Sequence, residues 1–278
     1  MKNDTYSLEF ITPCFCAGAE PGKAEIRVPS IRGELRWWFR VLGATAEQER
    51  GVFGGVHDGA RSSALVIRVR DVEPLCDEAD LRGLASQNTG KGYLCHFIRV
   101  SGKANGSRNG PRWQAGAFFS PGTRFSMEVL TRHPLDPTLS SLVDRALQCF
   151  RTLGTLGLRS TRGLGAWCER GGALPRGEDV ARLLDEIPGM VWTFGAPEKD
   201  WRAVLESMGT ALREFRKKNR LSGKSETAVG CSNPRHASAL HLRPVRTADG
   251  YLPVALYTDR TRKPELRSLA DLIPGFFT

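Results

Sequence analysis

The chain has 278 residues, and 40% of them are apolar. Its 40 Lys and Arg residues outnumber 30 Asp and Glu residues, which gives a formal net charge of +10 and a pI of about 9.6. This size predicts one large or two medium globular domains. The charge favours a polyanionic partner, nucleic acid before an anionic membrane, although a basic protein without such a partner has the same balance. No segment approaches the roughly 18 apolar residues of a membrane span, and the first residues lack the apolar core of a signal peptide, so we expect a cytoplasmic protein.

Seven cysteines, an odd number, are scattered without a CxxC pair. Structural zinc sites use paired Cys and His spacings, so we expect buried reduced thiols, with a zinc site as the alternative. The sequence predicts no metal and no other cofactor. The cysteines are Cys14, Cys16, Cys76, Cys95, Cys149, Cys168 and Cys231.

Apolar periodicity orders the first 170 residues as strand, helix, strands, helix, strand. Ser30 is the expected N-cap of the first helix. The predicted elements are a strand at 6–16, a helix at 30–43, strands at 64–72, 93–100 and 123–130, a helix at 138–153 and a short strand from Ala166. This is the βαββαβ order of a ferredoxin-like domain with inserted loops, which we assign to residues 1–175.

A smaller unit is predicted for residues 190–278, after a Pro- and Gly-rich boundary. Its elements are a strand at 190–194, a helix at 198–219, and a hairpin with strands at 238–246 and 251–257. This β-α-β-β order looks like a reduced version of the same fold. The predicted class is therefore α+β, with two ferredoxin-like (RRM-like) domains. A long loop at 101–116, rich in Gly, Ser and Asn, is expected to be functional.

The predicted helix at 30–43 carries a basic row of arginines spaced by four residues. Its first turn should offer free N–H groups to an anion such as phosphate, and an exposed Trp37 should be able to stack on a base. A solvated basic face is the alternative reading of the same row. The candidate RNA contacts in this helix are Ser30, Arg32, Gly33, Arg36, Trp37 and Arg40.

A second candidate is the glycine-rich loop, residues 154–165. Four glycines surround two arginines, and glycine lets a backbone approach a ligand while guanidinium groups bind phosphate as planar forks. The alternative is a helix C-cap followed by an irregular turn, for which one or two glycines suffice. The candidate RNA contacts here are Gly157, Arg159, Ser160, Thr161, Arg162 and Gly163.

A third basic stretch, residues 213–224, holds six Lys and Arg residues at a helix end, among which Arg216 and Lys217 are candidate phosphate contacts. The same charges also fit a helix C-terminus. The five histidines are isolated in the sequence. His57-Asp58 would suit an acid or metal pair in a ribonuclease, but we expect a surface turn there. His236 is the other candidate catalytic histidine. No HExxH, GxSxG, Walker A or paired zinc motif occurs, and we expect that the chain is not an enzyme.

Several stretches resemble one family. Residues 10–19 (FITPCFCAGA), 27–40 (RVPSIRGELRWWFR) and 52–54 (VFG) resemble the N-terminal signature of the first Cmr subunits, which are RAMP-superfamily proteins of type III-B CRISPR-Cas effector complexes. Residues 157–165 (GLRSTRGLG) resemble the glycine-rich loop of RAMP proteins, and residues 235–238 (RHAS) resemble their C-terminal segment, which adds Arg235 to the candidate RNA contacts. The chain departs from the family pattern at two places. Cys16-Ala17 stand where the family has paired small residues, and Ala239 stands where proline is common.

The resemblance implies a non-catalytic subunit at the end of a ribonucleoprotein, near the 3′ part of the crRNA and the 5′ side of the target RNA. The implied partners are crRNA, target RNA and other Cmr subunits, with no membrane. Two alternatives stay open. One is a RAMP endoribonuclease that processes the crRNA precursor with a histidine as general acid or base. The other is a basic protein whose arginines bind carboxylates of neighbouring subunits.

Overall fold

The computed structural model of the chain describes residues 3–20, 22–56, 59–77, 79–80, 84, 89–95, 99–100, 112–113, 117–221, 229–232 and 235–278. The strands are β1 (Asn3–Phe10), β2 (Leu65–Glu73), β3 (Arg99–Val100), β4 (Arg112–Trp113), β5 (Arg124–Thr131), β6 (Trp167–Glu169), β7 (Met190–Phe194), β8 (Cys231–Ser232), β9 (Arg235–His236), β10 (Leu240–Thr247) and β11 (Gly250–Thr258). The helices are α1 (Val28–Val41), α2 (Ala46–Phe53), α4 (Gly90–Leu94), α5 (Pro137–Leu153), α6 (Gly177–Asp185), α7 (Trp201–Lys218) and two 3₁₀ helices, η1 (Asp259–Thr261) and η2 (Ala270–Gly275).

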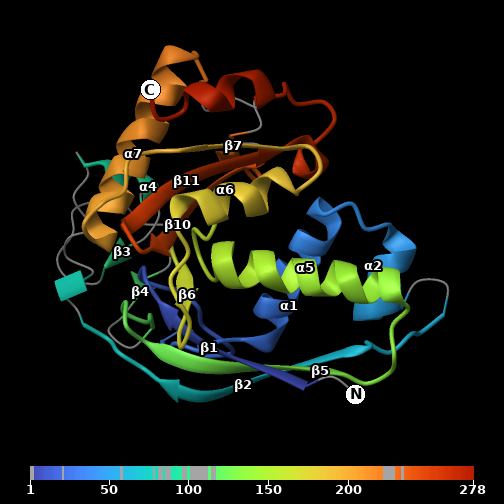
Figure 1. Ribbon diagram of the computed structural model, residues 1–278. Coiled ribbons are helices and arrows are strands. Elements are labelled where there is room, and N and C mark those ends of the chain that lie inside the picture. Colours follow the sequence, from blue (N-terminus) through green and yellow to red (C-terminus); the bar gives the residue numbers. More distant parts are fainter. Residues whose placement is uncertain are drawn as a thin grey trace.

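The first sheet has four antiparallel strands in the order β2-β5-β1-β6. Along β1, Leu8 and Phe10 are buried while Asn3, Thr5 and Ser7 are exposed, because successive side chains of a strand point to opposite faces. Helices α1 and α5 cover the buried face, and no element of the described residues covers the opposite face, which we call the open face (Figure 1).

Arginine and glutamate side chains form cross-strand ion pairs on this open face. Glu128 of β5 lies 3.0 Å from Arg70 and 3.8 Å from Arg68 of β2, and Glu9 of β1 lies 3.1 Å from Arg124 of β5. The outward positions of β1 and β5 alternate with the buried ones, and polar side chains predominate among them. The open face is therefore polar and internally paired.

The second sheet has three antiparallel strands in the order β10-β11-β7. Its face with Val254 and Leu256 belongs to the same hydrophobic core as α1, α5 and α6, whereas its face with Leu242 and Tyr257 packs against α7 and η2. Figure 1 shows α5 between the two sheets. The mixed α+β class with antiparallel sheets is thus confirmed, and the two sheets share a helix layer.

The predicted strand at 93–100 is wrong at its first residues. Residues Gly90–Leu94 form helix α4, Arg99 and Val100 form β3 as predicted, and residues 96–98 lie outside the described residues. The helix starts here because its first N–H groups find acceptors: the Thr89 hydroxyl caps it, and the Glu206 carboxylate of α7 accepts from the N–H groups of Gly90 and Lys91 at 2.6 and 3.2 Å.

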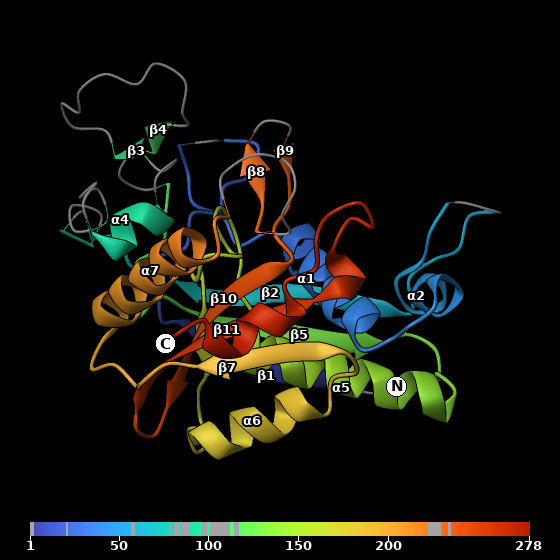
Figure 2. The ribbon, with the colours of Figure 1, turned by 90° about the horizontal axis from the view of Figure 1, so that it is seen from above.

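Helix α4 lies directly beside α7 (Figure 2). The two backbones approach so closely at Gly90 and Gly209 that a Cβ atom at either position would clash with the other chain segment. The helical conformation of α4 therefore depends on α7, whose Glu206 lies 116 residues from Gly90 in the sequence. Tertiary packing overrides the strand preference of Tyr93 and its neighbours here.

Two boundaries in the signature region also differ from the prediction. Helix α1 has Arg27 as its N-cap and begins at Val28, so Ser30 lies inside the first turn and is not the cap. The strand predicted to reach residue 16 ends at Phe10. Beyond it, the Thr12 hydroxyl donates to the Gly163 carbonyl at 2.8 Å, because this segment pairs with the glycine-rich loop and leaves the sheet.

Among the helices that the structure describes, none has the length and apolar content of a membrane-spanning segment. Within the described residues, no group of three or more His, Cys, Asp and Glu side chains could share a metal ion. Cys14, Cys16, Cys95 and Cys149 are buried free thiols, as predicted, while Cys76 is exposed.

Candidate nucleic-acid interface

The glycine-rich loop lies on the segment that follows β1. Gly157, Gly163 and Gly165 have positive φ angles of 83°, 84° and 66°. A Cβ atom at Gly157 would clash with the carbonyl of Phe15, so glycine is required for this close approach. The loop is fixed there because the Leu158 N–H donates to the Phe15 carbonyl at 2.8 Å.

The loop is also tied to the second sheet. The Leu242 N–H of β10 donates to the Thr161 carbonyl at 3.1 Å. Within the loop, the Thr155 hydroxyl donates to the Ser160 carbonyl at 3.1 Å. Arg162 is 6% exposed and donates to the carbonyls of Leu240, at 3.0 Å, and Val229. The loop therefore bridges the first sheet to the second.

Three of the predicted contacts, Arg159, Arg162 and Arg216, come together beside Tyr93. Arg159 donates from Nε to the Leu94 carbonyl at 2.6 Å, and Arg216 donates from Nη1 to the Tyr93 hydroxyl at 2.9 Å. Arg159 has a positive φ of 63°, a backbone conformation that is rare for a residue with a side chain. We call these four residues the arginine cluster.

The arginines of the cluster are close enough to repel one another. Burial, followed by the charges of Arg159 and Arg216, lowers the pKa of Arg162 to about 9, so this group still carries its proton at neutral pH. Burial also lowers the pKa of Arg159, and the charge of Arg216 adds to that effect. Arg159 and Arg216 are partly exposed, whereas Arg162 lies underneath. A bound anion would relieve this repulsion.

The basic row of α1 is paired with an acid. Glu49 of α2 lies 2.5 Å from Nε of Arg36 and 2.8 Å from Nη1 of Arg40, whose side chains are 43% and 49% exposed. Arg32 stands next in the row, and its pKa is lowered by burial and then by the charge of Arg36. The row exists as predicted, but Glu49 neutralises part of its charge.

The start of α1 does not present the predicted anion site. The Ser30 N–H already donates to the Arg27 carbonyl at 3.0 Å, so it is not free for a phosphate. Gly33 is exposed, with open space around its Cα.

Trp37 is half-buried, so the prediction of an exposed ring is wrong. It stacks on His241 of β10, with ring centroids 4.5 Å apart and an interplanar angle of 19°, and meets the edge of Trp38 at 4.6 Å. The periodicity of one helix does not reveal that a strand from the second sheet packs on this side.

The remaining predicted contacts are spread over other parts of the molecule. Lys217 is exposed and lines a groove of about 1000 Å³ between α7 and the residues around Phe276, away from its neighbour Arg216. Arg235 and His236 are described only as the backbone of β9, and His57 and Asp58 lie outside the described residues. The 101–116 loop also lies outside them, apart from the backbone of residues 112 and 113.

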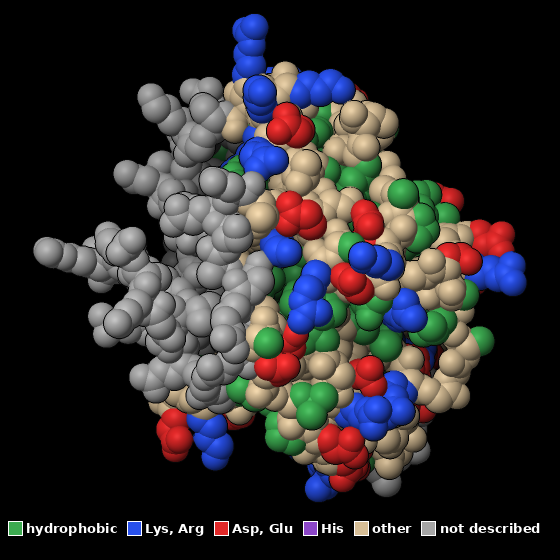
Figure 3. Space-filling model, turned by 90° about the vertical axis from the view of Figure 1, so that its left-hand side faces the viewer, with side chains coloured by type: hydrophobic (Ala, Val, Ile, Leu, Met, Phe, Trp, Pro, Cys, Tyr) green, Lys and Arg blue, Asp and Glu red, His purple; other side chains and the backbone are tan. Residues whose placement is uncertain are grey.

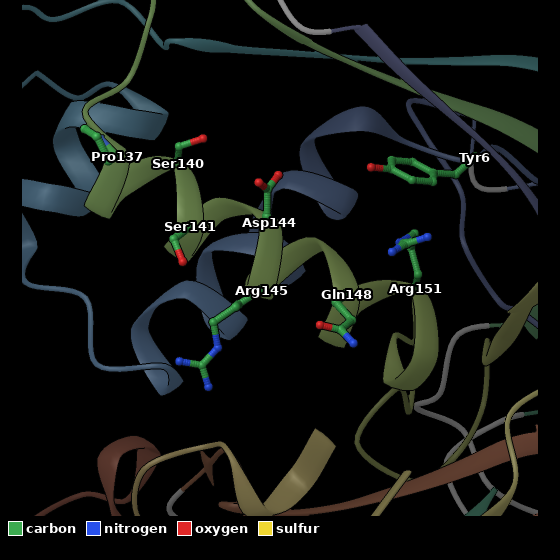
Figure 4. A pocket seen from close by; sticks show the side chains of 8 residues that line it. All are labelled: Tyr6, Pro137, Ser140, Ser141, Asp144, Arg145, Gln148 and Arg151. Atoms are coloured by element: carbon green, nitrogen blue, oxygen red, sulfur yellow. The ribbon is translucent and has the colours of Figure 1, made fainter. Parts of the chain in front are cut away.

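Surface charge is mixed elsewhere. Figure 3 shows Lys and Arg interspersed with Asp and Glu over the described part of the face that it displays. A polar groove between β1 and α5 has Tyr6 and Arg151 at one end (Figure 4), where the guanidinium carbon lies 4.6 Å from the ring centroid. Arg151 is bound to Glu169 at 2.6 Å, and no predicted contact lines this groove. The arginine cluster is therefore the best candidate site.

Sequence reasoning missed Tyr93 and Glu49. Glu49 lies in α2, whose N-cap Thr45 forms a capping box with Gln48, a T-x-x-Q signal that predicts a helix start. No sequence signal places Tyr93, because its helix depends on α7.

Comparison with known proteins gives two relatives that are both CRISPR Cmr subunits. Cmr subunit Cmr1-1 of Pyrococcus furiosus is 29% identical over 151 residues, which is 51% of this chain and 40% of that protein. Cmr1-2 of the same organism is 34% identical over 70 residues, which is 22% of this chain and 37% of that protein. The matches thus span about two fifths of each curated relative.

Solved structures show a similar fold. The crystal structure of apo Cmr1 from Pyrococcus furiosus matches with a TM-score of 0.61 at 20% identity, over 96% of this chain and 91% of that one. A chain of the type III-B Cmr-beta complex bound to cognate target RNA and AMPPnP, in the presence of ssDNA, matches with a TM-score of 0.60 at 13% identity, over 93% and 95%. These findings confirm the resemblance to Cmr subunits. Residues 7–169 match the model of the RAMP superfamily, and the chain belongs to that superfamily.

Proposed function

We propose that the chain is an RNA-binding, non-catalytic subunit of a type III-B CRISPR ribonucleoprotein effector complex that contacts the 3′ region of the crRNA, the target RNA, or both. The observation that carries the proposal is the convergence of Arg159, Arg162 and Arg216 beside Tyr93. Phosphate oxygens accept charge-assisted hydrogen bonds from guanidinium groups and neutralise their repulsion. The arginine cluster is therefore suited to an RNA backbone.

The proposed partners are crRNA, target RNA and other Cmr subunits. Two of the similar structures are Cmr-beta complexes bound to cognate target RNA. The net charge of +10 supports a polyanionic partner. The cluster offers backbone contacts, so it would bind RNA of any sequence, and specificity would come from base pairing between the RNA strands.

We further assign the two sheets to two ferredoxin-like units, residues 1–175 and 190–278. The first unit runs β1-α1-β2-β5-α5-β6 with the sheet order β2-β5-β1-β6. The second runs β7-α7-β10-β11 with the order β10-β11-β7, which corresponds to the same arrangement without its last helix and strand.

The test is the salt dependence of RNA binding. Changing Arg159→Gln and Arg216→Gln together should weaken binding of unrelated single-stranded RNAs alike and reduce the slope of log affinity against log salt by about 1–2, because each lost phosphate contact removes a released counterion. The matched control removes two exposed charges elsewhere, Arg68→Gln and Arg182→Gln, which pair with Glu128 and Asp179. An unchanged slope in the cluster variant, or an equal loss in the control, would contradict the proposal.

The same binding reactions test the absence of catalysis. RNA of the CRISPR repeat should stay intact on a denaturing gel after incubation with the purified chain. Cleavage that disappears with His57→Ala or His236→Ala would favour the processing endoribonuclease instead.

A further inference from the structure

One arginine lies in the middle of the shared core. Arg243 of β10 is 1% exposed, yet its guanidinium reaches three groups. It binds the Glu34 carboxylate at 2.8 Å, donates to the Thr155 hydroxyl, and meets Nδ1 of His241 at 3.0 Å. The three contacts belong to α1, to the glycine-rich loop and to β10.

The aromatic rings of α1 complete this arrangement. The guanidinium carbon of Arg243 lies 5.5 and 5.8 Å from the ring centroids of Trp37 and Trp38, within the range of cation–π attraction. Trp37 also stacks on His241. Arg243 therefore touches two of the segments that carry sequence-predicted RNA contacts, α1 and the glycine-rich loop, although it lies too deep to touch RNA itself.

We propose that Arg243 is a positioning residue of the RNA interface, which fixes α1 and the glycine-rich loop on the second sheet and so sets their relative placement. The inference rests on the proposed function, because it assumes that these two segments contact RNA. It goes beyond that function by naming an internal residue that determines how well the contacts fit.

Stability alone is a poor explanation for this ion pair. A buried ion pair is often no more stabilising than apolar side chains of the same shape, because both charges lose their hydration. Burial raises the pKa of Glu34, with Arg243 opposing that rise. In addition, Nε of Arg243 is buried and has no hydrogen-bond partner among the described residues. Stability and placement can therefore be separated by substitution.

The first experiment removes the link between Arg243 and the loop. Thr155→Val keeps the shape but removes the hydroxyl, and with it both the contact to Arg243 and the hydrogen bond to the Ser160 carbonyl. Thr155→Ser keeps the hydroxyl and both contacts and is the matched control. We expect the Val variant to bind RNA roughly fivefold more weakly than wild type with an unchanged salt slope, and the Ser variant to bind within about twofold of wild type. A reduced slope would mean a lost phosphate contact, and unchanged affinity would mean that the link does not matter; either result overturns the proposal.

The second experiment replaces the whole ion pair. Glu34→Met with Arg243→Met should retain the thermal midpoint better than Arg243→Met alone, because no unpaired carboxylate is left in the core. We expect the folded double variant still to bind RNA roughly fivefold or more weakly, again with an unchanged slope. Wild-type affinity in the folded double variant would show a purely structural role and would overturn the proposal.

Hydrogen–deuterium exchange without RNA separates this inference from the proposed function. The folded double variant Glu34→Met with Arg243→Met keeps the hydrogen bond from Thr155 to Ser160. It should speed exchange of the loop amides, such as Leu158, and leave those of β1 unchanged. If wild type binds no RNA, the proposed function fails, and the exchange result alone decides whether Arg243 holds the loop. Unchanged loop exchange would show that it does not.

Discussion

His241 is kept neutral by its surroundings. Burial, followed by the charges of Arg243 and Arg162, lowers its pKa well below the ordinary value of 6.5. Its Nδ1 faces the Arg243 guanidinium at 3.0 Å and can only accept a hydrogen bond there. Protonation would place a third positive charge among these groups, so the folded state disfavours it.

This neutrality predicts a stability loss in mild acid. The unfolded chain protonates His241 near pH 6.5 and the folded chain does not, so its contribution is complete above pH 6.5 and decreases as the pH falls toward the lowered folded pKa. Through His241 alone, the free energy of unfolding decreases by at most about 1.4 kcal/mol per pH unit. Urea unfolding from about pH 7 to about pH 5 should show a shallower decrease for His241→Gln than for wild type. Parallel decreases would contradict the assignment.

The arginines show what sequence can and cannot reveal about single residues. The spacing of four residues places Arg36 and Arg40 correctly on one helix row, because it fixes that geometry. Their partner Glu49 lies on another helix, so no pattern within α1 predicts this ion pair. Burial of Arg162 likewise depends on β10, and burial of Arg243 in β10 depends on α1 and the glycine-rich loop, which are distant in the chain from that strand.

Two helical glycines make a matched pair for testing element packing. Gly209 of α7 touches the backbone of α4 at Gly90, whereas Gly33 of α1 has nothing within 4 Å of a Cβ atom. We expect Gly209→Ala to destabilise the protein by about 1–3 kcal/mol, because the helices must separate. Gly33→Ala should stabilise it by about 0.5–1 kcal/mol through helix propensity. Chemical denaturation measures both, and stabilisation by Gly209→Ala would contradict the close packing.

At the scale of elements, strong periodicity predicts the structure well. The helix expected at 138–153 is α5 (Pro137–Leu153), and the strand expected at 190–194 is β7. The strand prediction fails at residues 93 and 94, which belong to helix α4 because Glu206 and Gly209 of α7 favour a helix there. Local pattern decides long elements, and distant contacts decide short ones.

The layering of the whole molecule predicts cooperative unfolding. Helix α5 lies between the sheets, and its buried side chains Leu147 and Phe150 share one hydrophobic core with Val254 and Leu256 of the second sheet. Calorimetry of the full chain should therefore give one transition with equal calorimetric and van't Hoff enthalpies. Two separate transitions would show that the sheets unfold independently.

The sequence predicts two units in order but not this shared layer. Each unit shows its own apolar periodicity, and nothing in a helical pattern says which of two sheets a helix face will meet. The resemblance to Cmr subunits points to the family, while the convergence of Arg159 with Arg216 becomes visible only in three dimensions.

The open face of the first sheet has a consequence for assembly. Arg68, Arg70 and Arg124 each have a glutamate within ion-pair distance on a neighbouring strand. A subunit docking there would exchange existing ion pairs for new ones, with little net release of counterions. Contacts through this face should thus tolerate rising ionic strength, while contacts through the arginine cluster should not.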